Sequence, residues 1–187
     1  MKEELLRAAE VLKRGGVILY PTDTVWGVGC DATNDEAVQR VYALKRSENK
    51  HSMTVLVGSV NDVGRYVRRV PEVAWQLLEV AEEPLTLILP GGVGVSPLLI
   101  PEAGTIGVRV PRHEFLVALL RRLGRPLVST SANISGADTP LTFSEISSEI
   151  RDGVDLVVSS RFEGRPTRKP SSIISLGVGG EIKIIRE

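Results

Sequence analysis

The chain has 187 residues, of which 42% are hydrophobic and 25% charged, so it can bury one real core. Lysine plus arginine number 23, as do aspartate plus glutamate, and this zero net charge excludes a polyelectrolyte binder but allows a local basic surface. One cysteine and two histidines exclude an intrachain disulfide and a dedicated His/Cys metal cage. We expect a single domain over residues 1–187.

The sequence carries no targeting or membrane signal. Residues 1–13 have acidic side chains and lack the apolar core of a signal peptide. No apolar run approaches the roughly 20 residues of a membrane span. We therefore expect a protein of the reducing cytoplasm with no membrane partner. Cys30 lies in a mostly apolar stretch and is expected to be a small buried residue rather than a catalytic thiol.

Helical and strand patterns alternate along the chain. Apolar residues at helical spacing predict helices at residues 1–13, 34–44, 61–67, 71–80, 113–123 and 142–151. Short apolar runs predict strands at residues 17–20, 54–57, 85–89, 105–110, 126–130, 154–158, 172–176 and 182–185. The helix ends are marked by an N-cap at Asn34, Pro71 in a first turn, Gly124 after a last turn, and a capping box of Thr142 with Glu145. This alternation indicates an α/β protein with a mixed sheet.

The familiar phosphate-binding and hydrolase motifs are absent. The sequence has no Walker A motif and no GxSxG elbow, and "GVGCDA" does not match GxGxxG. The glycines of "GGVGVSP" are followed by neither a lysine nor a helix, so this segment is expected to be a flexible loop. Any functional site must therefore be built from less regular polar clusters.

The first polar cluster is Thr22, Asp23 and Thr24, directly after the predicted strand at 17–20. Ligands in open α/β sheets bind outside the carboxyl ends of strands, so this turn is placed to bind a small polar ligand. The alternative is a turn whose hydroxyl and carboxylate groups cap their own backbone. The sequence leaves both open.

The second cluster puts Lys45, Arg46, Lys50 and His51 within seven residues at a helix end. Such cations suit a phosphate ligand. They also complement the negative end of a helix dipole, and this alternative stays open.

The third cluster lies in "TIGVRVP", where a period of two puts Thr105, Gly107 and Arg109 on one face of a strand. An arginine beside a hydroxyl, with room left by a glycine, is typical of a clamp for a carboxylate or phosphate. The alternative is an edge strand with one solvated face.

The fourth cluster, "LVSTSANISG", carries more polar groups than one turn needs, namely Ser129, Thr130, Ser131, Asn133 and Ser135. Ser129, Ser131 and Asn133 lie two residues apart and share a face if the chain stays extended. We interpret this stretch as ligand-facing. With the cationic clusters it describes a site that binds and orients anions, as phosphoryl or nucleotidyl transfer requires, and fits a protease or glycosidase poorly.

Five segments in this order resemble the YrdC/Sua5 family: "GGVILYPTDTVWGVGCDA", "LKRSENKHSMTVLV", "EPLTLILPG", "TIGVRVP" and "STSANISG". The resemblance implies a YrdC-like α/β fold, with a twisted mixed sheet and flanking helices around a basic concave cleft. It implies the compact single-domain form and an L-threonylcarbamoyladenylate synthase that uses L-threonine, bicarbonate and ATP with Mg²⁺. A threonylcarbamoyl transferase complex would then modify adenosine 37 of tRNA.

The same resemblance implies roles for individual residues. The implied catalytic residues are Lys45, Arg46, Ser131 and Asn133. The implied ATP-binding residues are Lys45, Arg46, Lys50, Thr105, Ser131, Asn133, Thr139 and Arg186. The implied threonine-binding residues are Thr22, Thr24, Arg109, Ser129 and Ser171. No dedicated protein metal site is implied, because Mg²⁺ would arrive with ATP.

This sequence departs from the family pattern in three places. Ser47 occupies the arginine position of the family's Lys-x-Arg, so either Arg46 reaches the phosphates or Lys50 or His51 replaces it. Glu82-Glu83-Pro84 stands for the usual Pro-Gly-Pro, and Leu56 stands where longer members have a histidine. These departures leave open a paralogue that transfers another carbamoyl or adenylyl group. A second alternative also stays open, because the same basic concavity could bind double-stranded RNA by its phosphates.

Overall fold

The computed structural model describes residues 1–48 and 53–187, and in these residues nine strands form one sheet in the order β7-β1-β2-β6-β3-β5-β4-β8-β9. The strands are β1 (Ile18–Tyr20), β2 (Gly27–Gly29), β3 (Thr54–Leu56), β4 (Leu85–Pro90), β5 (Thr105–Arg109), β6 (Leu127–Ser131), β7 (Leu156–Val157), β8 (Ser172–Leu176) and β9 (Ile182–Arg186). The pairs β1–β7, β3–β5 and β4–β8 are parallel and the others antiparallel, so the mixed sheet predicted from the sequence is confirmed.

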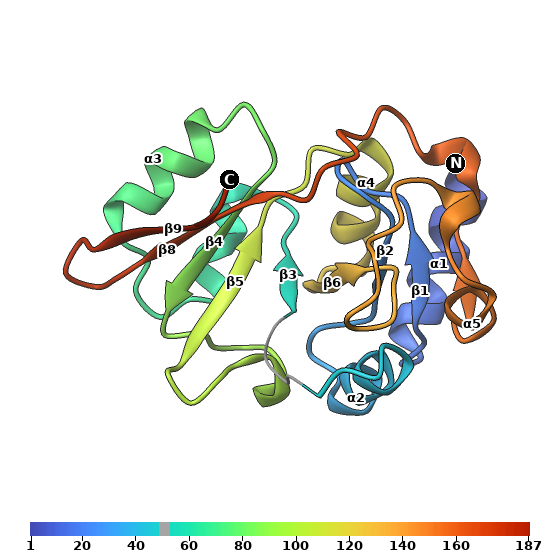
Figure 1. Cartoon of the computed structure of the whole chain (residues 1–187). Helices are drawn as coiled ribbons and strands as arrows, with labels where there is room; N and C mark the ends of the chain where they lie inside the picture. The colour runs from blue at the N-terminus through green and yellow to red at the C-terminus, as the bar shows by residue number, and fades with distance from the viewer. Residues whose placement is uncertain (49–52) are drawn as a thin grey trace.

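Helices flank both faces of this sheet (Figure 1). They are α1 (Lys2–Lys13), α2 (Asp35–Leu44), α3 (Glu72–Val80), α4 (Glu114–Leu123) and α5 (Ser148–Asp152), with 3₁₀ turns η1 (Val60–Arg65), η2 (Pro97–Leu99), η3 (Phe143–Glu145) and η4 (Ser160–Phe162). No helix of the described residues is both long and apolar enough to cross a bilayer.

The core has two parts because neighbouring strand residues point to opposite faces. On one face α1 and α4 bury Ile18, Tyr20, Leu56 and Leu127. On the other face α2 buries Leu19, Val28, Val55 and Val128. The sheet is therefore covered by apolar side chains on both faces, and β6 becomes polar in its second half, at Ser129, Thr130 and Ser131.

Two predicted helices differ from the structure. The segment expected to be a helix at 61–67 is the 3₁₀ turn η1. The predicted helix at 142–151 is two pieces, because Ile146 turns out of helical geometry with ψ of 126° and inserts its side chain into the core. The Thr142–Glu145 capping box is present on η3, and Ser147 caps α5 separately.

The strand β2 was not predicted, since "GVG" shows no apolar alternation. Its position depends on Gly29: a Cβ there would lie 1.7 Å from the carbonyl oxygen of Val128. Only glycine lets β2 approach β6 this closely.

The predicted N-cap of α2 is confirmed, because the Asn34 side chain accepts a hydrogen bond from the backbone N–H of Ala37 at 3.0 Å. We expect Asn34→Ala to lower the free energy of unfolding by about 1 kcal/mol, since that N–H loses its acceptor. Urea unfolding measures the change, and Asn34→Asp, which keeps the acceptor, is the matched control. Equal losses in both variants would contradict the capping role.

Candidate functional site

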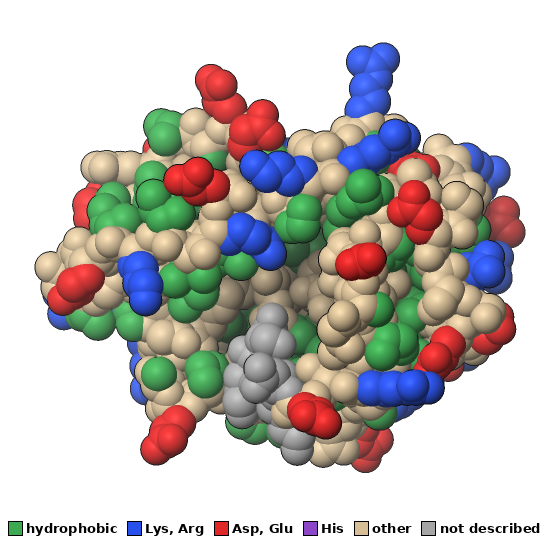
Figure 2. Space-filling model, viewed as in Figure 1, with side chains coloured by type: hydrophobic (Ala, Val, Ile, Leu, Met, Phe, Trp, Pro, Cys, Tyr) green, Lys and Arg blue, Asp and Glu red, His purple; other side chains and the backbone are tan. Residues whose placement is uncertain are grey.

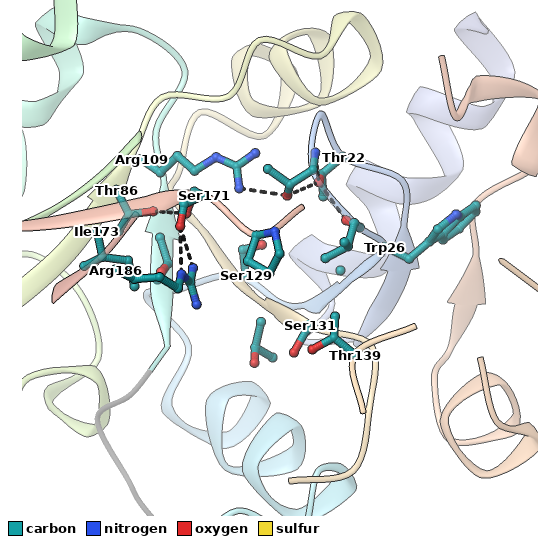
Figure 3. A pocket seen from close by; sticks show the side chains of 16 residues that line it. Thr22, Trp26, Thr86, Arg109, Ser129, Ser131, Thr139, Ser171, Ile173 and Arg186 are labelled. Carbon is teal, nitrogen blue, oxygen red and sulfur yellow. Dashed lines mark hydrogen bonds between the residues drawn. The ribbon is translucent and has the colours of Figure 1, made fainter. Parts of the chain in front are cut away.

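A cavity of about 200 Å³ opens where β2, β6, β3 and β5 meet the ends of β8 and β9. Figure 2 shows this face of the molecule hollowed at its centre, and Figure 3 shows the side chains that converge there. Its lining has nine hydroxyl side chains, from Thr22, Thr24, Thr54, Thr86, Ser129, Thr130, Ser131, Thr139 and Ser171. Arg109 and Arg186 line it too, and none of the described lining residues is a carboxylate. The cavity thus offers positive charge and hydrogen bonds to an anion.

The floor of the cavity follows from strand register. Ser129 of β6 lies opposite Thr54 of β3, and Ser131 lies opposite Gly27 of β2. Thr54 in turn lies opposite Gly107 of β5. Gly107 carries no side chain and leaves space beside Thr54, whose hydroxyl lies 3.8 Å from where a Cβ on Gly107 would be, whereas the ring of Tyr20 packs over Gly27. The polar end of β6 therefore faces a hollow, as the alternation in "LVSTS" predicted.

Arg109 forms the buried wall of the cavity at 6% exposure. Its Nη1 donates to Thr24 Oγ1 at 3.1 Å, and its Nη2 donates to the Asp23 carboxylate in a buried ion pair. The other Asp23 oxygen accepts the backbone N–H of Arg112 at 2.9 Å. Asp23 therefore holds Arg109 in place. The Arg109 Nε is buried and has no acceptor among the described residues.

The turn after β1 caps its own backbone, as one of the two interpretations expected, and it also lines the cavity. Thr22 Oγ1 donates to the carbonyl of Val25 at 2.7 Å and accepts the Thr24 N–H at 2.9 Å, so the turn caps its own backbone. The hydroxyls of Thr22 and Thr24 lie 2.9 Å apart and also line the cavity. Capping fixes these hydroxyls where a ligand can reach them.

The wall opposite the turn after β1 is made by Ser171 and Arg186 (Figure 3). The Ser171 hydroxyl lies 2.8 Å from Thr86 Oγ1, and its carbonyl accepts hydrogen bonds from Arg186 Nε at 2.9 Å and Nη2 at 2.7 Å. A β-bulge aims this arginine: Ile173 pairs with Arg186 and Ile174 with Ile184, which leaves Ile185 without a cross-strand partner. Burial, and then the nearby charge of Arg109, lower the pKa of Arg186.

Residues 163–171 run from η4 to β8 (Figure 1), and Pro170 and Ser171 at the end of this segment line the cavity. The Thr167 and Arg168 N–H groups donate to the carbonyls of Asp23 and Thr24 at 2.9 and 3.0 Å. This segment therefore ties the turn after β1 to the Ser171 wall.

Eight of the predicted site residues meet at the cavity: Thr22, Thr24, Arg109, Ser129, Ser131, Thr139, Ser171 and Arg186. Four others do not line it: Lys45, Arg46, Thr105 and Asn133. Lys50 and His51 lie outside the described residues.

Two of the four outlying residues, Lys45 and Asn133, adjoin the end of β6, and the other two do not. Lys45 is buried and donates to the carbonyls of Ser131 and Asn133. Asn133 donates to the carbonyls of Ile134 and Ala137, while its Oδ1 is buried with no partner in the described chain. Thr105 begins β5 opposite Pro90, beyond the cavity. Arg46 is exposed and forms an ion pair with Glu149 at 2.6 Å.

The sequence reading missed Thr54, Thr86 and Trp26. A threonine in an apolar strand carries no signal by itself, and only cross-strand register puts Thr54 beside Ser129 and Thr86 beside Arg109. Trp26 contributes at its backbone, since its ring points away from the cavity (Figure 3) and its Nε1 donates to Glu163 at 3.1 Å.

Cys30 is fully buried in the core, and burial raises the pKa of its thiol to about 12. A thiol that stays protonated is a poor nucleophile, so the prediction of a small buried residue is confirmed. Among the described residues no group of three or more His, Cys, Asp or Glu side chains is arranged to hold a metal ion.

Comparison with known proteins gives three findings. The family model Sua5/YciO/YrdC, described as telomere recombination, matches residues 10–187. A Hahella chejuensis protein named threonylcarbamoyl-AMP synthase is 32% identical over 95% of this chain and 96% of its own. A protein of the same name from Idiomarina loihiensis is 37% identical over 86% of this chain and 89% of its own.

Solved structures share the fold. E. coli YciO is 29% identical, with a TM-score of 0.86 over 100% of this chain and 90% of its own. P. abyssi Sua5 complexed with L-threonine is 26% identical, with a TM-score of 0.83 over 92% of this chain. The match covers 50% of the P. abyssi chain, so this chain spans about half the length of that protein. The YrdC-like fold expected from the sequence is confirmed.

Proposed function

This chain belongs to the Sua5/YciO/YrdC family, and we propose that it is a threonylcarbamoyl-AMP synthase that converts L-threonine, bicarbonate and ATP into threonylcarbamoyl-AMP and pyrophosphate. The observation that carries the proposal is a cavity with two arginines, nine hydroxyls and no carboxylate among its described lining residues. Two relatives that match nearly the whole chain bear this name.

Threonine is proposed to bind on the Arg109 side. Arg109 lines the cavity, and a guanidinium group is the usual partner of a carboxylate, which it binds with two N–H groups. Thr22, Thr24, Ser129 and Ser171 surround this position with hydroxyls that can bind the amino acid's polar groups.

The nucleotide is proposed to bind on the Ser131 and Arg186 side. The cavity is smaller than the roughly 300–1,000 Å³ of usual ligand pockets, so ATP must extend beyond it. Ser131, Thr139 and Arg186 would meet the phosphates. Asn133 follows Ser131 where β6 leaves the sheet, and contact of its side chain with the nucleotide stays a prediction. Nucleotide contacts by Lys50, Arg46 and Thr105 stay predictions.

The proposed reaction needs no covalent enzyme intermediate. The amine of threonine adds to CO₂ derived from bicarbonate, and the resulting carbamate oxygen attacks the α-phosphorus of ATP. The bond between the α-phosphorus and the oxygen that bridges to the β-phosphorus breaks, and pyrophosphate leaves with its electron pair. Two anions must be held together, and the guanidinium group of Arg186, which no carboxylate of the described residues neutralises, reduces the repulsion between them.

Mg²⁺ is proposed to enter with ATP. The hydroxyl lining fits a phosphate-held ion, because Mg²⁺ keeps several of its waters and hydroxyls accept hydrogen bonds from them. When bound, Mg²⁺ would neutralise charge on the phosphates. We further propose that the product passes to a threonylcarbamoyl transferase complex that modifies adenosine 37 of tRNA in the cytoplasm.

Pyrophosphate release tests the proposal. Purified protein is incubated with ATP, Mg²⁺ and bicarbonate, with L-threonine, with serine, or with neither amino acid. We expect release that requires both threonine and bicarbonate. Release driven by a different acceptor would indicate a paralogue, and no release from a folded protein that binds double-stranded RNA would indicate a binding module. Either result would overturn the proposal.

A further inference from the structure

Lys45 caps the C-terminal end of α2, and its ammonium group is enclosed by protein. The residue is 5% exposed, and Nζ donates to the carbonyl of Ser131 at 2.5 Å and to the carbonyl of Asn133 at 2.7 Å. No carboxylate of the described chain pairs with it. Burial lowers the pKa of Lys45 to about 8. Burying a charge without an opposite charge costs free energy, so the placement of this ammonium group against two carbonyl oxygens calls for a functional explanation.

The two carbonyls belong to the segment where β6 leaves the sheet. Ser131 is the last residue of β6 and its side chain lines the cavity. Between these two carbonyls lies Ala132, whose backbone N–H donates to the carbonyl oxygen of Trp26 at 3.1 Å and so fixes the chain. The N–H of Ser135 donates to the carbonyl of Lys45 at 2.8 Å, so the end of α2 and the end of β6 bind each other in both directions.

Proteins usually bind alkali-metal ions and other hard cations with carbonyl oxygens that converge on the ion. Here a side-chain ammonium occupies the place of such an ion. Two of its three N–H groups are used in these bonds, so at most one is left for another ligand such as a phosphate. If the ammonium group moved away to give a phosphate more than one N–H, both buried carbonyls would lose this donor, which costs free energy at each.

We propose that Lys45 is a positioning residue whose ammonium group acts as a tethered cation, holding the Ser131 and Asn133 carbonyls together and thereby fixing the Ser131 hydroxyl at the cavity. Its removal would leave a cation site that a small alkylammonium ion can refill. The catalytic part of this inference rests on the proposed function, whereas the effect on the backbone does not.

The experiment compares Lys45→Ala with the matched control Lys13→Ala, which removes an exposed lysine at the end of α1. Amide hydrogen exchange over residues 131–136 is measured with ethylammonium chloride and, as an ionic control, with tetramethylammonium chloride, which has no N–H to donate. In Lys45→Ala we expect exchange about tenfold faster in this segment and turnover about tenfold lower. Ethylammonium should reverse both, and tetramethylammonium neither.

Unchanged exchange in Lys45→Ala, with a rise confined to the KM for ATP, would overturn the proposal and make Lys45 a phosphate ligand. Faster exchange and lower turnover in Lys45→Ala that ethylammonium does not reverse would also overturn it. If Lys45→Ala does not fold, Lys45→Met keeps the side-chain volume without the charge, and its exchange and unfolding midpoint are measured with and without the amine. If the wild type shows no turnover, the proposed function fails while the exchange measurement still decides the role of Lys45.

Discussion

Arg109→Ala should lower threonine-dependent turnover by about 10³-fold and destabilise the fold by about 3–5 kcal/mol. The turnover falls because the variant lacks the guanidinium group that is proposed to bind the carboxylate of threonine. The stability falls because the Asp23 carboxylate, buried in an ion pair with Arg109, is left with only the N–H of Arg112 as a partner. Pyrophosphate release and urea unfolding measure the two effects separately.

The matched control removes both charges of the pair. Arg109→Met combined with Asp23→Asn keeps similar volumes and leaves no uncompensated buried charge, so most of the stability should return. Turnover should stay low, because no guanidinium faces the cavity. Recovery of turnover in the double variant would show that Arg109 serves only to neutralise Asp23, and the threonine site would have to lie elsewhere.

The sequence predicted most of the site because its residues follow buried strands. Ser129 and Ser131 point to the cavity since β6 keeps its alternation to its last residue, and Arg109 shares its face with Gly107 as the period of two requires. Asn34 marks the start of α2 and Gly124 the end of α4, through local hydrogen bonds that the sequence alone specifies. These features depend on neighbours within a few residues.

The features that the sequence did not predict depend on contacts between distant segments. Gly29 is needed because of a carbonyl at Val128, and Thr54 enters the site through its register with Ser129. Asp23 in a polar turn gave no sign that it would neutralise an arginine 86 residues away. The sequence placed Lys45 in a cationic cluster at a helix end, as a phosphate ligand or a partner of the helix dipole, whereas the structure buries its charge against β6.

Arg186→Ala should raise the KM for ATP by about 10²-fold and change the free energy of unfolding by less than about 1 kcal/mol. Among residues 1–48 and 53–187 its guanidinium donates only to the carbonyl of Ser171, and no carboxylate pairs with it. Asp23 already neutralises Arg109, so Arg186 carries the uncompensated charge of the cavity lining. ATP kinetics at several substrate concentrations measure the effect.

Lys183→Ala is the matched control, because it removes an exposed cation from the same strand outside the cavity lining. Its KM for ATP should stay near that of the wild type. Salt gives an independent criterion: the wild-type KM for ATP should rise with ionic strength, and this rise should be smaller in Arg186→Ala, since screening acts on the charge that has been removed. An unchanged KM together with a lower unfolding midpoint would contradict this role, because Arg186 would then act only as a clamp on Ser171.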